Sequence, residues 1–399
     1  MSNWSEYKLG ELIVNGKADL QTGPFGTMLN ASEYSSDGVP VIAVQDIGDN
    51  KLIYHKFVYV NQETAERLKR YRVLENDIIF GRKGAVERRA LIKKAESGWL
   101  QGSDCIRLRV DSSIDAKFIS YQLGSSYHRD WLMQHATGAT MPSLNQDVLK
   151  LLPLKIPPLA KQKEISDILD SIDKKIDLLH RQNKILEQLA ETLFRQWFVE
   201  EAEESWEVGK LDDVISVKGG TTPSTSQPEF WNGHIHWTSP RDLSSASSIF
   251  LFDTERKITE KGLAQIGSGL LPVGTVLLSS RAPIGYLTIT EIPVAINQGY
   301  IAIVCDKLVS NYFIFLWCRA NMDTIENAGN GSVFQEISKA SFKNLELVIP
   351  PNDKLKLFNK EIEPLFQKLK YNTIQIHTLT QLRDTLLPKL MSGEARINY

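Results

Sequence analysis

The feature that most constrains this 399-residue chain is an internal repeat. Three similar stretches occur in both halves and in the same order: Trp4–Ile13 and Trp206–Ile215, Leu154–Pro158 and Leu347–Pro351, Leu189–Leu193 and Leu382–Leu386. The second and third pairs share one offset, 193 residues, while the segments between the anchors differ freely. A period of this length indicates duplicated domains rather than a solenoid. We therefore expect a variable body followed by a more similar tail, twice.

Each body is predicted to be mixed α/β. Short segments rich in β-branched and apolar residues, bounded by glycine or aspartate, indicate strands. They are Val39–Val44, Asp77–Phe80 and Cys105–Val110 in the first body, and Thr275–Leu278, Leu287–Thr290 and Gly299–Val304 in the second. Residues 118–133 and 312–325 are predicted to be helical.

The tails carry apolar residues at alternating steps of four and three over more than four heptads, which is typical of a coiled-coil seam. The first seam is Ile165, Leu169, Ile172, Ile176, Leu179, Asn183, Leu186, Ala190, Leu193 and Trp197; the second is Phe358, Ile362, Leu365, Leu369, Asn372, Ile376, Leu379, Arg383, Leu386 and Leu390. Pro364 must start or kink the second helix. About 40 helical residues span roughly 60 Å, and two such seams in one chain most simply pack on each other.

Two asparagines indicate the direction of this packing. Asn183 falls at an a position and Asn372 at a d position, and in an antiparallel pair a residues face d residues. Helices aligned at their centres would place Asn183 opposite Asn372, where each amide can satisfy the other and fix the register. The alternative is that both asparagines are solvated at loose points of the seam.

The predicted fold class is therefore α/β, with two globular bodies joined by two long helices that form an antiparallel coiled coil with pseudo-two-fold symmetry. We expect the first body at 1–156, the central helix at 157–203, the second body at 204–349 and the C-terminal helix at 350–399.

The composition is that of an ordinary globular protein, with 42% hydrophobic and 24% charged residues. Cys105, Cys305 and Cys318 lack metal or disulfide spacing, which indicates a reducing compartment. The sequence contains neither a signal-peptide pattern nor the roughly 20 apolar residues of a membrane span. We therefore expect a cytoplasmic location.

The formal net charge of −2 counts against a simple basic DNA-binding domain. The charge is uneven, however, because arginine and lysine crowd residues 67–94 and glutamate crowds residues 200–204. A local positive field can attract phosphate while the total charge stays near zero.

Together these features resemble the specificity subunit of type I restriction-modification systems. The stretches that carry the resemblance are Gly23–Gly26, Val39–Asp46, Asp77–Gly84, Gly102–Ile106 and Thr137–Leu144 in the first half, Lys218–Ser224, Trp237–Asp242, Ser280–Gly285 and Asn297–Gly299 in the second, and the ending Leu386–Glu394. The resemblance covers nearly the whole chain. A single stretch is weakly specific, but the order of body, helix, body and helix is strongly so.

The resemblance implies that each body is a target-recognition domain that reads one half of an asymmetric, two-part sequence in double-stranded DNA. It implies that the helices set the number of unread base pairs between the half-sites. It also implies that they dock two methyltransferase subunits and, through these, the restriction subunits. The chain itself is then non-catalytic and needs no cofactor, while S-adenosylmethionine, ATP and Mg²⁺ are expected on partner subunits.

Candidate DNA contacts are residues that suit phosphate and base edges. In the first body these are Arg82, Lys83, Arg88 and Arg89, which leave a strand through a turn with glycine. A solvated, charged hairpin is the alternative for this stretch. The cluster Arg67–Arg72 is interpreted as a solvated helix face with intrahelical ion pairs.

In the second body, the glycine-rich loop with Lys218, Thr221 and Thr222 suits phosphate or groove contact. It lacks the ending of a nucleotide-binding loop, which argues against ATP. Arg241 and Arg281 each follow a strand-like segment and are further candidates, although either could pair with a carboxylate inside its own domain.

Enzymatic activity has weak support. Asp242, Glu255 and Lys257 have the loose spacing of a metal-nuclease triad, but such triplets are common by chance. The segment after Lys257 also fits a helix start with Thr259 as N-cap. Seven dispersed histidines show no metal spacing. The second hypothesis for function is a coiled-coil scaffold whose bodies bind something other than DNA.

Overall fold

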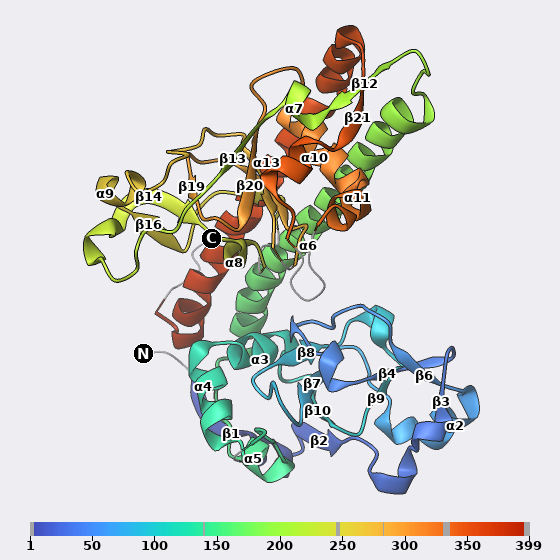
Figure 1. Cartoon of the computed structure of the whole chain (residues 1–399). Coiled ribbons are helices and arrows are strands. Elements are labelled where there is room, and N and C mark those ends of the chain that lie inside the picture. The colour runs from blue at the N-terminus through green and yellow to red at the C-terminus, as the bar shows by residue number, and fades with distance from the viewer. Residues whose placement is uncertain (1–3, 139, 245–247, 282, 330–335, 395–399) are drawn as a thin grey trace. The chain divides into compact units, whose positions relative to one another are not determined.

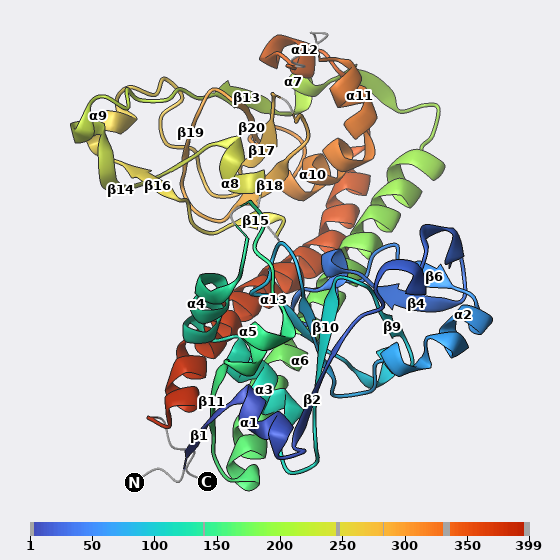
Figure 2. The ribbon, with the colours of Figure 1, turned by 90° about the horizontal axis from the view of Figure 1, so that it is seen from below.

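The computed structural model describes residues 4–138, 140–244, 248–281, 283–329 and 336–394. The chain divides into two compact units (Figures 1 and 2): unit 1 is Met1–Asp177 with His377–Tyr399, and unit 2 is Leu178–Ile376. Two long helices, α6 (Leu159–Arg195) and α13 (Asn352–Ser392), contribute to both units. Each unit therefore combines one body with a segment of each helix. The expected domain boundaries at residues 156, 203 and 349 stay predictions. The division into compact units places each body together with parts of both long helices, so it does not test where a body ends and a helix begins.

Unit 1 contains a five-stranded sheet in the order β2–β10–β7–β8–β5, a four-stranded sheet in the order β3–β6–β4–β9, and the pair β1–β11. The strands are β1 (Ser5–Lys8), β2 (Ala18–Thr22), β3 (Tyr34–Ser35), β4 (Val39–Ile42), β5 (Asp49–Asn50), β6 (Val58–Val60), β7 (Ile78–Gly81), β8 (Arg89–Leu91), β9 (Leu100–Gln101), β10 (Cys105–Val110) and β11 (Pro153–Ile156). The helices of the body are α1 (Leu9–Val14), α2 (Gln62–Arg67), α3 (Ala116–Leu123), α4 (Ser126–His135) and α5 (Gln146–Lys150).

Unit 2 has a matching arrangement, with a five-stranded sheet β13–β20–β17–β18–β15, the pair β12–β21, and a three-stranded sheet β16–β14–β19 in place of the four-stranded one. The strands are β12 (Glu207–Lys210), β13 (Ser216–Gly219), β14 (Trp231–Thr238), β15 (Phe250–Leu251), β16 (Arg256–Ile258), β17 (Val276–Ser279), β18 (Leu287–Thr290), β19 (Ala295–Ile296), β20 (Tyr300–Val304) and β21 (Glu346–Ile349). The helices are α7 (Leu211–Val214), α8 (Pro240–Ser244), α9 (Glu260–Leu263), α10 (Asn311–Ala320), α11 (Met322–Asn327) and α12 (Lys339–Lys343). The duplicated α/β architecture is confirmed.

The central strands show why these sequences form buried sheets. In β10 the alternate residues Ile106 and Leu108 join the apolar core under the helices, while Cys105 joins the core on the opposite face. In β20, Ile301 and Ile303 take the first role, and Tyr300 faces the other core. The two strands therefore bury both faces, as strands in the middle of covered sheets do.

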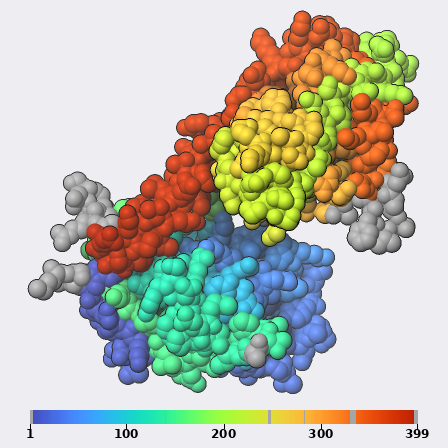
Figure 3. Space-filling view, turned by 60° about the vertical axis from the view of Figure 1, so that its left-hand side comes forward, coloured from blue at the N-terminus to red at the C-terminus, as the bar shows by residue number. Residues whose placement is uncertain are grey.

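The long helices pack in antiparallel fashion, as the heptads predict. In unit 2, Asn183 of α6 lies beside Asn372 of α13, and Phe194 lies beside Phe358, so numbers rise along one helix as they fall along the other. In unit 1, Arg383 contacts Asp173 in the same sense. Every predicted seam position is buried or half-buried. The C-terminal turns of α13, red in Figure 3, lie against the first body, where Leu390 and Met391 join its apolar core. Within the described ranges, no helix combines the length and hydropathy that a membrane span requires.

Two helix predictions need correction, and one alternative of a third is excluded. The helix expected at 118–133 is interrupted at Gly124 and Ser125, which separate α3 from α4, because Ser125 has an extended backbone (φ −66°, ψ 153°) that an α-helix cannot accommodate. The helix expected at 312–325 is interrupted at Asn321, which ends α10. Of the two alternatives for Pro364, a helix start is excluded, because α13 begins at Asn352 and continues past the proline. A kink at Pro364 stays a prediction. The expected segment 350–399 also includes 395–399, which lie outside the described residues.

Candidate nucleic-acid interface

Three loops of unit 1 leave the five-stranded sheet at one end. Strands β2 and β7 both pair antiparallel with β10, so the loops after Thr22 and Gly81 meet the loop before Cys105. Hydrogen bonds join these loops and the segment before α5: the Arg82 amide donates to the Asp104 carbonyl (2.7 Å), the Leu144 amide to the Arg82 carbonyl (2.8 Å), and Gln146 Nε2 to Thr22 Oγ1 (2.9 Å). We call residues 23–26, 82–88, 102–104 and 140–144 the loop end of unit 1.

Unit 2 has the same construction. The Ser280 amide donates to the Gly299 carbonyl (2.8 Å), and the Ile337 amide donates to the Ser280 carbonyl (3.0 Å). These bonds place Ser280 where unit 1 has Arg82, and Arg281 where unit 1 has Lys83. We call residues 220–226, 280–281, 283–286, 297–299 and 336–338 the loop end of unit 2. The stretches that carry the family resemblance, apart from the chain ending and from residues 139 and 282 outside the described ranges, meet at or beside these two surfaces.

The cations predicted for unit 1 lie together in the β7–β8 loop, with one exception. Arg82 is half-buried and its guanidinium lies 5.2 Å from the centroid of the Phe25 ring. Lys83 is exposed, with Nζ 3.4 Å from Asp104. Arg88 is exposed, with Nε 4.0 Å from its neighbour Glu87. Exposed pairs of this kind are worth about 0–1 kcal/mol, so Lys83 and Arg88 can exchange their present contacts for phosphate.

Arg89 does not belong to this surface, and its prediction as a DNA contact was wrong. Its side chain is 3% exposed, and Nε donates to the Ser120 carbonyl (2.7 Å) while the guanidinium pairs with Asp49. Burial raises the pKa of Asp49, but the Arg89 and Arg129 guanidiniums outweigh it and hold that pKa below the ordinary value. Arg89 therefore joins β8, β5 and α3 inside the body and cannot reach a groove.

The candidates of unit 2 are spread over three segments. Lys218 and Thr221 are exposed at the end of β13 and in the loop after it, and Thr222 Oγ1 donates to Gln298 Oε1 (2.8 Å). Arg281 is half-exposed, with Nε 3.0 Å from Glu336. Arg241 is exposed on α8, and among the described residues its side chain has no hydrogen-bond or ion-pair partner. This unit thus carries its positive charge thinly across the surface.

Two residues beside these surfaces, Lys339 and Gln45, were not predicted from the sequence. Lys339 begins α12 and its Nζ lies 2.7 Å from where a Cβ on Gly219 would be, so it covers the strand end beside the glycine-rich loop. Gln45 lies in a 3-10 turn, Val44–Asp46, that follows β4, and its side chain is exposed. Glutamine is uncharged, so it does not stand out in a search for basic residues. Alignment of Val44-Gln-Asp46 with Pro240-Arg-Asp242 in the repeat could have identified Gln45 as a candidate.

Two residues of the loose metal-nuclease pattern, Asp242 and Lys257, are engaged elsewhere. Asp242 Oδ2 accepts from the Ser239 amide (2.7 Å), and Lys257 Nζ lies 3.5 Å from Asp253. Thr259 caps α9 by accepting from the Gly262 amide (3.2 Å), as predicted. Within the described ranges, no group of three or more His, Cys, Asp and Glu side chains could hold a metal ion.

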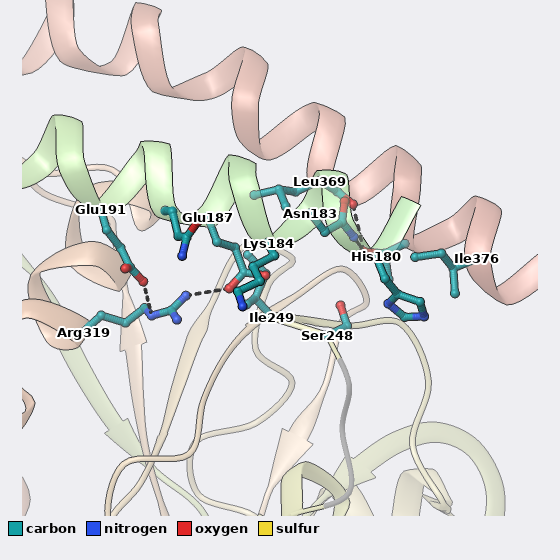
Figure 4. Close-up of a pocket in the computed structure, with 12 residues that line it drawn as sticks. His180, Asn183, Lys184, Glu187, Glu191, Ser248, Ile249, Arg319, Leu369 and Ile376 are labelled. Carbon is teal, nitrogen blue, oxygen red and sulfur yellow. Dashed lines mark hydrogen bonds and ion pairs between the residues drawn. The ribbon is translucent and has the colours of Figure 1, made fainter. Parts of the chain in front are cut away.

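The cavities lie away from the loop ends, where each body meets the helices of its own unit. In unit 2 a cavity of about 340 Å³ lies between α6 and the segment after α8, and Figure 4 shows Arg319 reaching from α10 toward Glu187 and Glu191 of α6 (2.9 and 3.0 Å). In unit 1 a cavity of about 670 Å³ is lined by Tyr121, Asp173 and other polar side chains. Ion pairs cross both cavities, which identifies them as body–helix junctions.

Comparison with known proteins gives one consistent result. The family model of the type I restriction modification DNA specificity domain matches residues 1–188 and again residues 203–385. The MjaIX specificity subunit of Methanocaldococcus jannaschii is 36% identical over 170 residues, which cover 42% of this chain and 39% of that protein. The HindI specificity subunit of Haemophilus influenzae is 21% identical over a match that covers 99% of this chain and 100% of that protein. The crystal structure of a type I restriction-modification S subunit from M. genitalium has the same fold, with a TM-score of 0.65, 16% identity, and coverage of 98% of this chain and 96% of that one.

Proposed function

Because this chain belongs to the type I restriction-modification DNA specificity family, we propose that each of its units reads one half of a two-part sequence in double-stranded DNA. The observation that carries this proposal is the loop end, built twice on the same hydrogen-bond frame with different exposed side chains. A retained frame provides the same approach to a groove, while different side chains select different bases.

The exposed cations supply phosphate contacts. Lys83 and Arg281 occupy equivalent positions, and each is paired with a carboxylate only at the solvent-exposed surface. Binding then depends steeply on salt, because each phosphate contact releases counterions. The chain's own part is binding and orientation, without catalysis or a cofactor, whereas S-adenosylmethionine, ATP and Mg²⁺ act on partner subunits. A cytoplasmic location belongs to the same proposal.

The long helices are proposed to set the spacing of the half-sites and to dock two methyltransferase subunits, which in turn bind the restriction subunits. Helix α6 exposes Leu178 and Leu189, and α13 exposes their repeat equivalents Tyr371 and Leu382, each between 41% and 58% exposed. Residues 11 apart lie on one helix face, so each helix has a related apolar stripe. Two related stripes suit two copies of one partner.

The decisive experiment is genome-wide mapping of methylated bases in cells that carry this chain and its methyltransferase partner. We expect a two-part sequence, and exchange of residues 1–156 for those of a relative should change only one half. If both halves changed, the proposal of two independent readers would fail. DNA binding of the complex that ignored salt and sequence would instead favour the scaffold hypothesis.

Partner docking has a separate test. Leu189→Lys and Leu382→Lys should each remove one of two methyltransferase subunits from the complex, as measured by native mass spectrometry. Val14→Lys, at an 87% exposed residue of α1, is the matched control. A complex that keeps both subunits in both variants would contradict docking on these stripes. Insertion of one heptad in α6, with a matching heptad in α13, should lengthen the unread spacer.

A further inference from the structure

Beside each loop end, one position has the same backbone hydrogen bonds around it in both units but a different side chain. Strand β4 pairs in parallel with β9, with Ile42 opposite Gln101, and β14 pairs in parallel with β19, with Thr238 opposite Ile296. The next amides repeat the same bond: Gly102 N donates to the Ile42 carbonyl (2.9 Å), and Asn297 N donates to the Thr238 carbonyl (3.0 Å). Ile42 and Thr238 are therefore equivalent, and so are the short helical turns that follow them.

A buried or half-buried aspartate closes both turns. Asp46 Oδ2 accepts from the Ala43 amide (2.6 Å), and Asp242 Oδ2 accepts from the Ser239 amide (2.7 Å). The residue before the aspartate is Gln45 in unit 1 and Arg241 in unit 2. Both side chains are exposed, and in the described part of the chain neither makes a hydrogen bond or ion pair. The backbone of each position is fixed while its side chain is available.

Both turns pack directly against a loop end. A Cβ on Gly81, at the start of the β7–β8 loop, would lie 3.1 Å from Val44 Cγ1, and a Cβ on Gly299 would lie 3.0 Å from Pro240 Cγ. Val44 and Pro240 are themselves equivalent, and each precedes the exposed residue. Gln45 and Arg241 therefore stand at the edges of the surfaces that also hold Lys83 and Arg281.

We infer that Gln45 and Arg241 are specificity-determining residues, which read an adenine in the first half-site and a guanine in the second. This inference rests on the proposed DNA-reading function. The side-chain amide of glutamine can bond adenine N6 and N7 together, and guanidinium can bond guanine O6 and N7. A phosphate-binding position would gain from a positive charge in both units, and only unit 2 has one here. Gln45 and Arg241 present different hydrogen-bond donors and acceptors from equivalent backbone positions. Two half-sites of different sequence require such a difference.

The test uses the complete complex with its methyltransferase and maps methylated sequences in cells. Gln45→Ala should make one A·T position of one half-site degenerate, and Arg241→Ala should relax one G·C position of the other half-site. Discrimination at the affected base pair should fall by roughly tenfold. Gln45→Arg should shift the first position toward G·C, and Arg241→Gln should shift the second toward A·T.

The control residues lie in short helices near the opposite ends of β4 and β14. Gln62 follows β6, whose register with β4 places it at the opposite end of β4 from Gln45, and Lys261 lies in α9 beside the segment that precedes β14. Gln62→Ala and Lys261→Ala should leave the methylated sequence unchanged, and thermal melting should show that all six variants are folded.

Three outcomes separate the hypotheses. If the unaltered chain gives a two-part sequence that Gln45→Ala and Arg241→Ala both preserve, base reading by these residues is wrong while the proposed function stands. If the variants weaken binding equally for all sequences, the two side chains contact phosphate, and the inference is again overturned. If the unaltered chain yields no two-part sequence, the proposed function itself fails.

Discussion

The two units share a backbone frame but reverse its charges where the body meets the helices. In unit 1, Lys93 lies two residues past the last paired residue of β8, and its Nζ is 3.8 Å from Asp177. In unit 2, Glu291 has the same place after β18 and is 2.5 Å from Lys370, the repeat equivalent of Asp177. Each body is thus electrostatically matched to its own helix segments, and exchanging the bodies alone would bring like charges together.

The loop ends differ in another way. In unit 1 the cations Arg82, Lys83 and Arg88 are concentrated in one loop, whereas in unit 2 Lys218, Arg241 and Arg281 are distributed over three segments. The hydrogen-bond frame under both surfaces is the same. The backbone that supports each surface is therefore the same in both copies of the repeat, while the side chains on that surface have diverged.

The largest effect is expected from Arg89→Leu. This change introduces the residue that unit 2 has at the equivalent position, Leu287. Leucine cannot donate to the Ser120 carbonyl or pair with Asp49. Loss of these charge-assisted hydrogen bonds should lower the free energy of unfolding of unit 1 by about 3 kcal/mol. Hydrogen exchange resolved by segment would measure it, with unit 2 unchanged. Arg88→Leu is the neighbouring control, and equal stability of the two variants would contradict a structural role for Arg89.

The next effect concerns the reversed junction. Glu291→Lys places two cations together at a site where the Glu291 side chain is only 8% exposed, and unit 2 should lose about 2 kcal/mol. Adding Lys370→Glu should restore most of that loss. Lys93→Glu in unit 1 should cost less, because Lys93 is 57% exposed. A double variant no more stable than Glu291→Lys alone would show that the pair is not coupled.

The asparagine pair offers a third test. Asn372 Nδ2 donates to Asn183 Oδ1 (2.9 Å), as the antiparallel register predicts, and Asn372 is fully buried. The expected return bond is not formed, because Asn183 Nδ2 donates to Thr373 Oγ1 (3.4 Å) instead. Asn183→Ala removes the nearer of the two acceptors of this buried amide, the other being Gln182 Oε1 at 3.4 Å, and should cost about 1–2 kcal/mol. Replacing both residues by leucine should recover stability but loosen the helix register. Cysteine cross-linking between shifted positions of α6 and α13 would detect that slippage; unchanged cross-linking would argue against a register role.

A smaller effect is expected on DNA binding. Lys83→Ala and Arg281→Ala should each lower the affinity of the complex about fivefold for every sequence and reduce the salt slope by about one. Binding measured at several salt concentrations would separate this from base reading. If either variant changed the preferred sequence, the equivalence of these two cations as phosphate contacts would be wrong.

The smallest effect is a pH dependence confined to unit 1. Burial of His128 lowers its pKa, the Pro153 carbonyl contact opposes this, and Arg89 lowers it further. The unfolded chain therefore binds a proton more readily than the folded one, so stability is present above pH 6.5 and declines as the pH falls through that value, by at most about 1.4 kcal/mol per unit. His128→Gln should abolish this difference between the units in acid-titrated hydrogen exchange.

Much of the frame was predictable because it rests on local periodicity. The strand Cys105–Val110 was predicted to the residue, and the seam followed from the heptads. Arg89 was not, since a charged residue after a turn carries no sign that Asp49 and Ser120 will enclose it. The need for glycine at residue 124 has the same origin, because the Arg89 guanidinium occupies the space where a Cβ would lie. Gln45 was missed because its place depends on the parallel pairing of β4 with β9, a non-local contact.

The division of the units has a consequence for synthesis on the ribosome. Unit 2 is one uninterrupted segment, Leu178–Ile376, whereas unit 1 needs the turns of α13 that begin at His377. Leu390 and Met391 belong to the same apolar core as Leu9 and Phe118. The body that is synthesised first is therefore completed last. Part of the apolar core of unit 1 stays exposed on the nascent chain while unit 2 is synthesised and folds.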